Sequence, residues 1–390
     1  MKVLIVQEHV DAGRGGAETA TLEMARHLAA LGLDVHLACA AGADPAAAPA
    51  LTWHPIPAAG ATRALRTYRY LQGVQRLRAT ARFDVVHAVV PSLTATVYQP
   101  RGGTYVETVA RTLARVRAPI LRELKRLGRR FNVRQRFLAR LERRLLTHYV
   151  GRVTVAAVSH YVRRQIEVQY GVPTQRIRVV FNGVDFTPLP PHEAAATRAA
   201  LRARLGLDER TPVLLFVAHN FALKGLRELL SALPRVPGTL VVAGRDRPRR
   251  YAARAARLGV AQRVRFVGVE TPVRDWYAAA DVLAHPTWYD PCSRVVLEAL
   301  SAGLPVVTTR YNGAAEVVQP TGCGRVVAEP ADTPALAAAL HEALTPEVRR
   351  TCAAAAPELR QSLSMARHAR ELLALYQDLR QGRAPPRPPP

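Results

Sequence analysis

The sequence lacks long apolar runs and has few cysteines. No uninterrupted apolar stretch reaches about 20 residues, the length that a helix needs to cross a bilayer. The four cysteines lie far apart and form no paired CxxC or Cys/His spacing: Cys39, Cys292, Cys323 and Cys352. The sequence therefore predicts neither a transmembrane helix nor a zinc site nor a disulfide framework.

Acidic and aromatic residues are also scarce. Asp and Glu number 30 against 55 Lys and Arg, which gives a formal net charge of +25. A field of that size attracts nucleic acid, anionic lipid or phosphorylated glycolipid, although an Ala- and Arg-rich composition can also leave a merely solvated face. Nucleic-acid binding would need aromatic platforms between the basic residues, and aromatics make up only 6%. We therefore expect no nucleic-acid partner.

The length of the chain and its first residues limit the class of protein to which it can belong. A chain of 390 residues predicts two domains, because single cores stop growing near about 250–300 residues. The start, MKVLIVQEHV, has neither the longer apolar run nor the small-residue cleavage site of a secretory signal. We expect a cytoplasmic location.

Apolar runs alternate with helical periodicity along the chain. Such alternation predicts an α/β protein with parallel sheets, because parallel strands need crossover connections. The strands predicted before the Pro-rich segment NGVDFTPLPP are 3–6, 35–38, 84–90, 153–158 and 177–181, and those predicted after it are 213–218, 240–243, 264–267, 282–285, 306–308 and 325–327. The second series is long enough for a full doubly wound sheet.

These patterns predict a domain organisation. The expected parts are an N-terminal Rossmann-like domain over 1–185, a C-terminal Rossmann-like domain over 186–358, a helix over 359–380 packing back toward the first domain, and a disordered tail over 381–390. The Pro-rich segment at 182–191 would be the linker between the two domains.

A glycine-rich turn, GRGGAE, follows the first predicted strand at 13–18. Glycines let a ligand approach the backbone, and the next helix offers unpaired N–H groups to a phosphate. A tight turn without any ligand explains the same residues equally well, because the motif GxGxxG is not matched.

A stronger motif lies at 285–307, HPTWYDPCSRVVLEALSAGLPVV. Pro291 favours the start of a helix that runs to about Ala302 and whose N-terminus could bind phosphate. If helical throughout, the interval from Asp290 to Glu298 would span about 12 Å, roughly the length of a nucleotide diphosphate from ribose to sugar. The alternative is that Asp290 only caps the helix and Glu298 is solvated.

This D-x7-E block resembles the E-x7-E signature of the retaining family 4 glycosyltransferases, with Asp290 in place of the first Glu. The turn at 15–16 and the segments DVVHA, VSHYVRRQI, VVFNGVD, NFALKGL and LPVVTTRYNGAAEVV are similar to that family in the same order. The resemblance extends from residue 3 to about residue 344 and is most detailed for the lipopolysaccharide core glucosyltransferase branch. It implies the GT-B fold, in which two Rossmann-like domains with parallel sheets face each other across a cleft.

The resemblance also implies a reaction and a role for each matching residue. A hexose, glucose from UDP-glucose, would pass to a glycolipid or oligosaccharide acceptor such as lipopolysaccharide core. Lys224 would contact the donor diphosphate, Glu298 the ribose and Asp290 the transferred sugar. Catalysis would rest on Asp290 and Lys224, and the donor-binding set would be Gly15, Gly16, His219, Lys224, Val269, Cys292, Ser293, Arg294, Val295 and Glu298.

Two positions depart from the family pattern. His219 stands five residues before Lys224, where many relatives have Arg, so one diphosphate contact is missing or comes from Arg245 or Arg294. Many relatives also have a His in a TxH-like motif, whereas the comparable stretch here is VYQPRGGTY at 97–105. The roles of residues 101–104 stay open, as does the choice for His87 between a sheet-end residue and a substrate contact.

Retaining transfer places negative charge on the departing diphosphate, so the site needs cations and N–H donors more than a strong base. The resemblance and the lack of a DxD motif in a plausible donor loop predict metal-independent chemistry with no cofactor. A sugar-nucleotide epimerase on the same fold is the nearer alternative, since fold does not fix function. A polyanion-binding protein is a further alternative.

Residues 111–145 combine leucines at helical spacing with many Arg and Lys. An ordinary surface helix with its leucines in the core would explain the pattern. The other interpretation is that part of the stretch is exposed and rests on anionic lipid, where each basic residue contributes about 1 kcal/mol. Membrane or acceptor contacts are expected at Arg126, Arg129, Arg130 and Arg134. Such docking would place the protein peripherally at the inner face of the cytoplasmic membrane.

Overall fold

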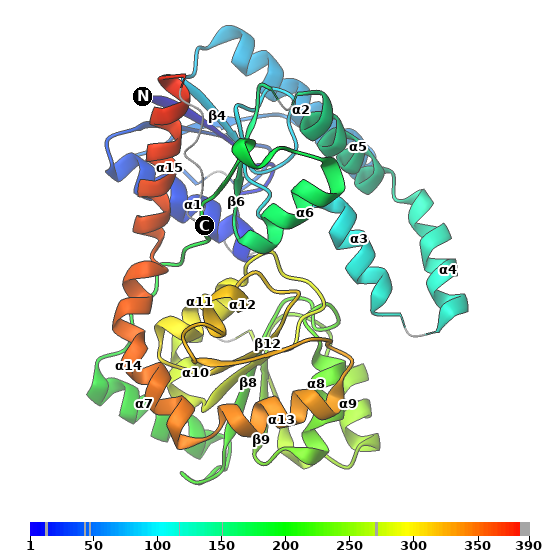
Figure 1. Ribbon diagram of the computed structural model, residues 1–390, viewed down its shortest axis with the longest axis vertical. Coiled ribbons are helices and arrows are strands. Elements are labelled where there is room, and N and C mark those ends of the chain that lie inside the picture. The colour runs from blue at the N-terminus through cyan, green and yellow to red at the C-terminus, as the bar shows by residue number, and fades with distance from the viewer. Residues whose placement is uncertain are drawn as a thin grey trace. The chain divides into compact units, whose positions relative to one another are not determined.

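A computed structural model of the protein describes residues 1–11, 15–42, 44–46, 48–116, 118–149, 151–269 and 272–382. The chain divides into two compact units, which are coloured along the sequence in Figure 1. Unit 1 contains residues 1–185 and the chain from 365 onward, and unit 2 contains residues 186–364. The predicted tail lies outside the described residues from position 383.

Unit 1 is built on a seven-stranded parallel sheet with the strand order β3-β2-β1-β4-β5-β6-β7. Its strands are β1 (Lys2–Val6), β2 (Asp34–Cys39), β3 (Thr52–Pro55), β4 (Val85–Ala88), β5 (Val97–Tyr98), β6 (Thr154–Ala157) and β7 (Ile177–Val179). The sequence did not reveal β3 and β5. The first is an edge strand, TWHP, with few apolar residues, and the second is only two residues long.

Seven α-helices belong to the described part of unit 1. They are α1 (Gly16–Ala30), α2 (Arg63–Thr80), α3 (Tyr105–Ala114), α4 (Pro119–Gly128), α5 (Val133–His148), α6 (His160–Tyr170) and α15 (Met365–Arg380). Side chains of α1 and α15 share one core with β1 and β2, including the buried Met24, Leu372 and Tyr376. Helix α15 is thus part of the hydrophobic core of unit 1, although it follows unit 2 in the sequence.

The helix predicted over 359–380 is two helices. One helix, α14 (Pro346–Ser362), belongs to unit 2, and α15 starts at Met365, whose N–H donates to the carbonyl of Val184 at 3.2 Å. Apolar residues continue at helical spacing through the break, with Leu359 and Leu363 both buried. Periodicity therefore did not reveal that the two halves pack in different units.

Unit 2 contains a six-stranded parallel sheet with the order β10-β9-β8-β11-β12-β13. Its strands, all six predicted, are β8 (Val213–Val217), β9 (Thr239–Ala243), β10 (Val264–Gly268), β11 (Val282–His285), β12 (Val306–Thr309) and β13 (Gly324–Val327). Its helices are α7 (Pro191–Arg204), α8 (Leu226–Ala232), α9 (Arg249–Arg257), α10 (Val273–Ala279), α11 (Arg294–Ser301), α12 (Ala315–Val318), α13 (Thr333–Ala343) and α14.

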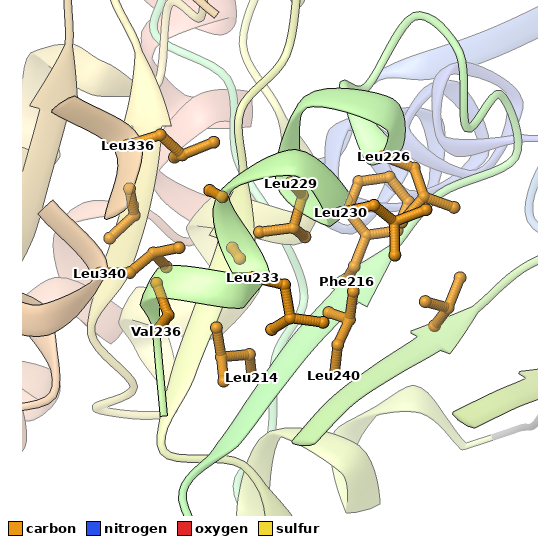
Figure 2. Close-up of a cluster of buried hydrophobic side chains, with 14 of the residues drawn as sticks. Leu214, Phe216, Leu226, Leu229, Leu230, Leu233, Val236, Leu240, Leu336 and Leu340 are labelled. Atoms are coloured by element: carbon orange, nitrogen blue, oxygen red, sulfur yellow. The ribbon is translucent and has the colours of Figure 1, made fainter. Parts of the chain in front are cut away.

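The core of unit 2 fixes α8 on the sheet. Figure 2 shows leucines of α8 pointing toward Leu214 and Phe216 of β8, with Leu336 and Leu340 of α13 beside them. Leu226, Leu229 and Leu230 are fully buried, and burying a leucine is worth about 1.5–3 kcal/mol. The loop between β8 and α8 is therefore anchored at both ends.

A buried carboxylate ties α7 and α14 to the sheet of unit 2. Asp281, 4% exposed, lies 2.6 Å from Arg198, 3.3 Å from Arg202 and 3.1 Å from Arg349. It also accepts the N–H of Val213 at the start of β8, at 2.8 Å. Arg202 is itself only 3% exposed, so Asp281 balances a buried positive charge.

Replacing Asp281 with Ala should therefore lower the free energy of unfolding by about 3–5 kcal/mol, because it leaves buried arginine without its carboxylate. Urea unfolding measures the change. Asp275→Ala is the matched control, since Asp275 is more exposed and lies 3.7 Å from Arg274, and it should cost within about 0.5 kcal/mol. Equal stability of the two variants would show that Asp281 is not an anchor.

Candidate active site

Two loops of unit 2 bring the predicted residues together. β8 and β11 are neighbours at the point where the strand order reverses, and ligands of open α/β sheets bind outside the carboxyl ends of strands at such a point. The loop after β8 carries His219 and Lys224, and the loop after β11 carries Asp290. Lys224 and Asp290, 66 residues apart in sequence, therefore meet at one sheet edge.

Lys224 and Asp290 form an ion pair. The Lys224 Nζ lies 2.6 Å from Oδ2 of Asp290 and donates a second hydrogen bond to the carbonyl of Tyr289 at 3.1 Å. An ammonium has three N–H donors, so one of them is left over for a ligand. Oδ1 of Asp290 accepts no hydrogen bond from the described residues. The pair thus offers one cationic donor and one carboxylate acceptor side by side.

His285, the last residue of β11, lies behind Asp290. Its Nε2 is 3.6 Å from Oδ2 of Asp290 and 3.4 Å from Oγ of Ser293. Burial acts to raise the pKa of Asp290, but the Lys224 ammonium and then His285 outweigh it and hold that pKa well below its usual range. Burial lowers the pKa of His285, against the opposing effect of Asp290. Asp290 is therefore a carboxylate near neutral pH and cannot serve as a general acid.

The loops after β8 and β11 are fastened to each other through backbone atoms. The carbonyl of Leu223 accepts the N–H of Trp288 at 2.9 Å and the hydroxyl of Thr287 at 3.2 Å. Gly225 separates Lys224 from α8 with φ at 83°, and a Cβ there would lie 2.0 Å from the carbonyl oxygen of Pro286. Only glycine fits that contact, which keeps Lys224 close to the second loop.

The backbone of Asp290 is tied to the loop after β12. Its N–H donates to the carbonyl of Tyr311 at 2.9 Å, and its own carbonyl accepts the N–H of Gly313 at 2.9 Å. Asn312, between them, accepts the N–H of Ser293 through its side-chain oxygen at 3.1 Å. Asp290 is therefore extended backbone in a parallel bridge with Asn312.

This bridge corrects the prediction that a helix starts at Pro291. The helix α11 begins at Arg294, with Ser293 as its N-cap residue, because the bridge holds the preceding residues outside helical geometry. The interval from Asp290 to Glu298 is thus not one helix, and the estimate of its length does not apply. Asp290 is not a helix cap either.

Glu298 lies on α11 and is held on two sides. Its Oε2 accepts the Tyr277 hydroxyl at 2.8 Å, and its Oε1 lies 3.4 Å from Arg294. Its side chain is 20% exposed, so it is not the solvated helix residue of the alternative interpretation. Burial, followed by the charge of Glu298, raises the pKa of Tyr277 well above its usual range. Glu298 thus lies on α11, which begins four residues after Asp290.

The other predicted donor residues of unit 2 differ in accessibility. Cys292 and Ser293 are buried, and Arg294 is 12% exposed. His219 is exposed after β8, and Val269, 50% exposed, follows Gly268 at the end of β10. Each thus lies at or after the carboxyl end of a strand, or at the start of α11.

Sequence reasoning missed three contributors to the site. His285, Tyr277 and Asn312 support Asp290 and Glu298, and none of them belongs to the D-x7-E motif. The available signals were that His285 ends a predicted strand and that Asn312 follows another. No pattern pointed to Tyr277, whose role arises from the packing of α10 beside α11. Within the described ranges, no group of three or more His, Cys, Asp or Glu could hold a metal ion.

The predicted glycines of unit 1 lie at the carboxyl end of β1. Gly16 is the first residue of α1, and Gly15 precedes it, with its carbonyl accepting the N–H of Thr19 at 3.2 Å. Residues 12–14 of the GRGGAE turn are outside the described part of the chain.

Arg101 and His87 are interior residues of unit 1. Arg101, 8% exposed, donates to Asn182 at 3.2 Å and lies 3.0 Å from His368 of α15. His87 is fully buried with Nδ1 2.7 Å from the Tyr376 hydroxyl, and burial lowers its pKa to about 3. His87 is therefore a packed histidine near the end of β4. Its burial favours the interpretation as a sheet-end residue over that as a substrate contact.

The four basic residues assigned to a membrane or acceptor differ. Arg126 is 71% exposed and lies 3.5 Å from Glu123, and Arg129 donates to the carbonyl of Val109 at 3.1 Å. The side chain of Arg130 lies outside the described atoms. Arg134, whose side chain is 38% exposed, donates to the buried Glu8 at 2.7 Å, so its guanidinium has a partner within unit 1, and its assignment to a membrane contact stays a prediction.

Comparison with protein families gives one match in each unit. The family described as Glycosyltransferase Family 4 matches residues 14–187, and the family described as Glycosyl transferases group 1 matches residues 211–346.

Two curated relatives are similar over part of the chain. The lipopolysaccharide glucosyltransferase WaaG of Escherichia coli is 37% identical over 155 residues, which are 38% of this chain and 41% of that protein. A D-inositol 3-phosphate glycosyltransferase of Xylanimonas cellulosilytica is 42% identical over 164 residues, 38% of each chain. The matched segments span about two fifths of the length of these relatives.

Solved structures match over nearly the whole chain. The crystal structure of WaaG has a TM-score of 0.77 at 25% identity and covers 96% of this chain and 99% of its own. Anabaena HepE in complex with UDP-glucose has a TM-score of 0.72 at 19% identity, with 97% and 100% covered, which shows a common fold. Sheets, family matches and the likeness to WaaG agree: the chain belongs to the family 4 glycosyltransferases of GT-B fold, close to the lipopolysaccharide core branch.

Proposed function

We propose that this enzyme transfers glucose from UDP-glucose, with retention of configuration, to a glycolipid or oligosaccharide acceptor such as lipopolysaccharide core. The observation that carries the proposal is the Lys224–Asp290 pair at the carboxyl edge of β8 and β11, beside the first turn of α11. A relative named lipopolysaccharide glucosyltransferase and a structural relative holding UDP-glucose support the choice of donor and acceptor.

The residues of unit 2 divide the work of holding a donor. The third N–H of Lys224 would donate to the diphosphate, whose charge grows as the sugar leaves. The N–H of Ser293 already donates to Asn312, so the N–H of Val295, in the unpaired first turn of α11, is the better donor to the same phosphates. Glu298 would accept the ribose hydroxyls.

Asp290 would orient the sugar. Its free Oδ1 can accept a sugar hydroxyl while Oδ2 stays on Lys224. The acceptor hydroxyl would lose its proton to an oxygen of the departing diphosphate, since a carboxylate with a strongly lowered pKa is a weak base. In this proposal, the Lys224 ammonium and the backbone N–H donors stabilise the charge of the diphosphate in place of a metal. A chelator should therefore leave the rate of sugar transfer unchanged.

Lys224→Ala and Glu298→Gln should each weaken UDP binding or turnover by about 1.5–3 kcal/mol, or roughly ten- to a hundred-fold, because each removes a hydrogen bond to a charged group. Calorimetric titration with UDP and steady-state kinetics measure the losses. Arg257→Ala and Glu347→Gln are the matched controls, since both residues are exposed in unit 2 and outside the site. Unchanged affinity and turnover in both site variants would remove this donor site.

Asp290→Asn should lower turnover by the same roughly ten- to a hundred-fold while changing UDP affinity much less, because UDP lacks the transferred glucose that Asp290 would contact. Asp290→Glu, which restores the carboxylate usual in the family, should retain more turnover than Asp290→Asn. If Asp290→Asn weakens UDP binding as strongly as it lowers turnover, Asp290 acts on the nucleotide and the assignment to the sugar is wrong.

We further propose that the enzyme rests on anionic lipid through α4. The described helices include none that is long and apolar enough to cross a membrane, so attachment would be peripheral. One face of α4 exposes Ile120, Leu124 and Leu127, which are 77%, 58% and 49% exposed, and Phe131 beyond it is 84% exposed. Its other face carries Arg122, Lys125 and Arg126.

This arrangement is that of a helix lying in a membrane interface, with apolar residues inserted and basic residues near the headgroups. Figure 1 shows α4 standing away from the sheet of unit 1. The predicted amphipathic stretch over 111–145 is divided: Leu138 and Leu145 on α5 are buried in unit 1, whereas the exposed apolar residues lie on α4, at Phe131 and at Val133, where α5 begins. An acceptor embedded in the same lipid would then lie within reach of unit 1.

Ile120→Asp with Leu124→Asp should abolish co-sedimentation with phosphatidylglycerol vesicles at about 0.1 M salt, while UDP affinity stays unchanged. Val168→Asp is the control, because Val168 is 85% exposed on α6 of the same unit and does not belong to α4. If the unaltered protein ignores anionic vesicles even at low salt, docking through α4 is wrong.

A further inference from the structure

A groove of about 1000 Å³ lies in unit 1, within the size range of small-molecule sites. It opens between α2 and α5, which pack against each other (Figure 1). The residues that line the groove include Lys2, the first residue of β1, and Asp84, which directly precedes β4. The groove therefore lies at the amino edge of the sheet. Gly15 and Gly16, which follow β1 in the chain and begin α1, belong to the opposite edge, and the groove is therefore separate from any ligand bound there.

The groove has an excess of cations. Three arginines line it: Arg78 of α2, Arg144 of α5 and Arg82. None of the three pairs with a carboxylate among the residues that the structure places. Lys2 contributes a fourth charge, with its Nζ 5.3 Å from the centre of the Phe83 ring. The single acid is Asp84, whose carboxylate accepts the backbone N–H of Lys2 at 2.6 Å. An anion is the ligand that these charges favour.

The walls between the cations are aromatic. Phe83, Phe137, Tyr68 and Tyr149 line the groove, and the rings of Tyr68 and Phe137 meet edge to face at 6.1 Å. Gln72, which donates to the Tyr68 hydroxyl at 2.9 Å, keeps its amide oxygen for a ligand. Aromatic faces, an amide group and cations together recognise a base and its phosphates, whereas an acyl chain would leave the amide without a partner.

We propose that this groove binds a nucleoside phosphate, as a second nucleotide site apart from the donor site of unit 2. The base lies against Tyr68 and Phe137, and the phosphates face Arg78 and Arg144. The proposal does not depend on the proposed reaction, because no residue of unit 2 takes part in it.

Binding of ADP and of UDP to the Lys224→Ala protein, measured by equilibrium dialysis, tests the proposal with the donor site weakened. At least one of the two nucleotides should still bind, at one site for each chain. Adding Arg78→Ala and Arg144→Ala should weaken that binding by about tenfold or more. Irradiation with 8-azido-ADP should attach label to peptides of α2 or α5.

The matched control adds Arg76→Ala and Arg143→Ala instead, which remove the same charge from the same two helices outside the groove. This protein should bind nucleotide like the Lys224→Ala parent, and thermal unfolding should show all three proteins folded. The proposal is overturned if neither nucleotide binds the parent, if both double substitutions weaken binding equally, or if dodecyl phosphate displaces the photolabel and the nucleotides do not.

Discussion

Lys224 joins the loops after β8 and β11 through its 2.6 Å contact with Asp290, and the other parts of the candidate active site depend on that pair. The pair brings a cation and a carboxylate to the point where the sheet order reverses, which is where a nucleotide can reach both. It also keeps Asp290 ionised despite burial. Neither loop could hold its charged side chain half-buried alone, because a buried charge without a partner costs several kcal/mol.

The surrounding structure restricts how the pair can move. Three fully buried leucines anchor α8 directly after Lys224, and Gly225 allows the chain to touch Pro286. The parallel bridge at Asn312 fixes Asp290 from the other side. The geometry of the Lys224–Asp290 pair thus rests on backbone contacts among the three loops that follow β8, β11 and β12, all of which belong to unit 2.

The sequence predicted the parts whose signal is local. All six strands of unit 2 contain adjacent apolar residues that mark them locally, and the D-x7-E spacing located Asp290 and Glu298. The start of α11 was missed because Pro291 favours a helix locally, whereas the bridge to Asn312, a contact between distant residues, prevents one. The ion pair of Arg134 was missed for the same reason: its partner, Glu8, lies 126 residues away. Contacts of that kind leave no periodic pattern.

The most direct measurement of the central claim is a crystal structure of the enzyme with UDP-glucose bound. The account predicts diphosphate oxygens within about 3 Å of Lys224 Nζ and of the Val295 N–H, the ribose on Glu298 and a glucose hydroxyl on Oδ1 of Asp290, at ordinary hydrogen-bond distances. A nucleotide bound elsewhere in unit 2, or a diphosphate that leaves the Lys224–Asp290 pair untouched, would contradict it.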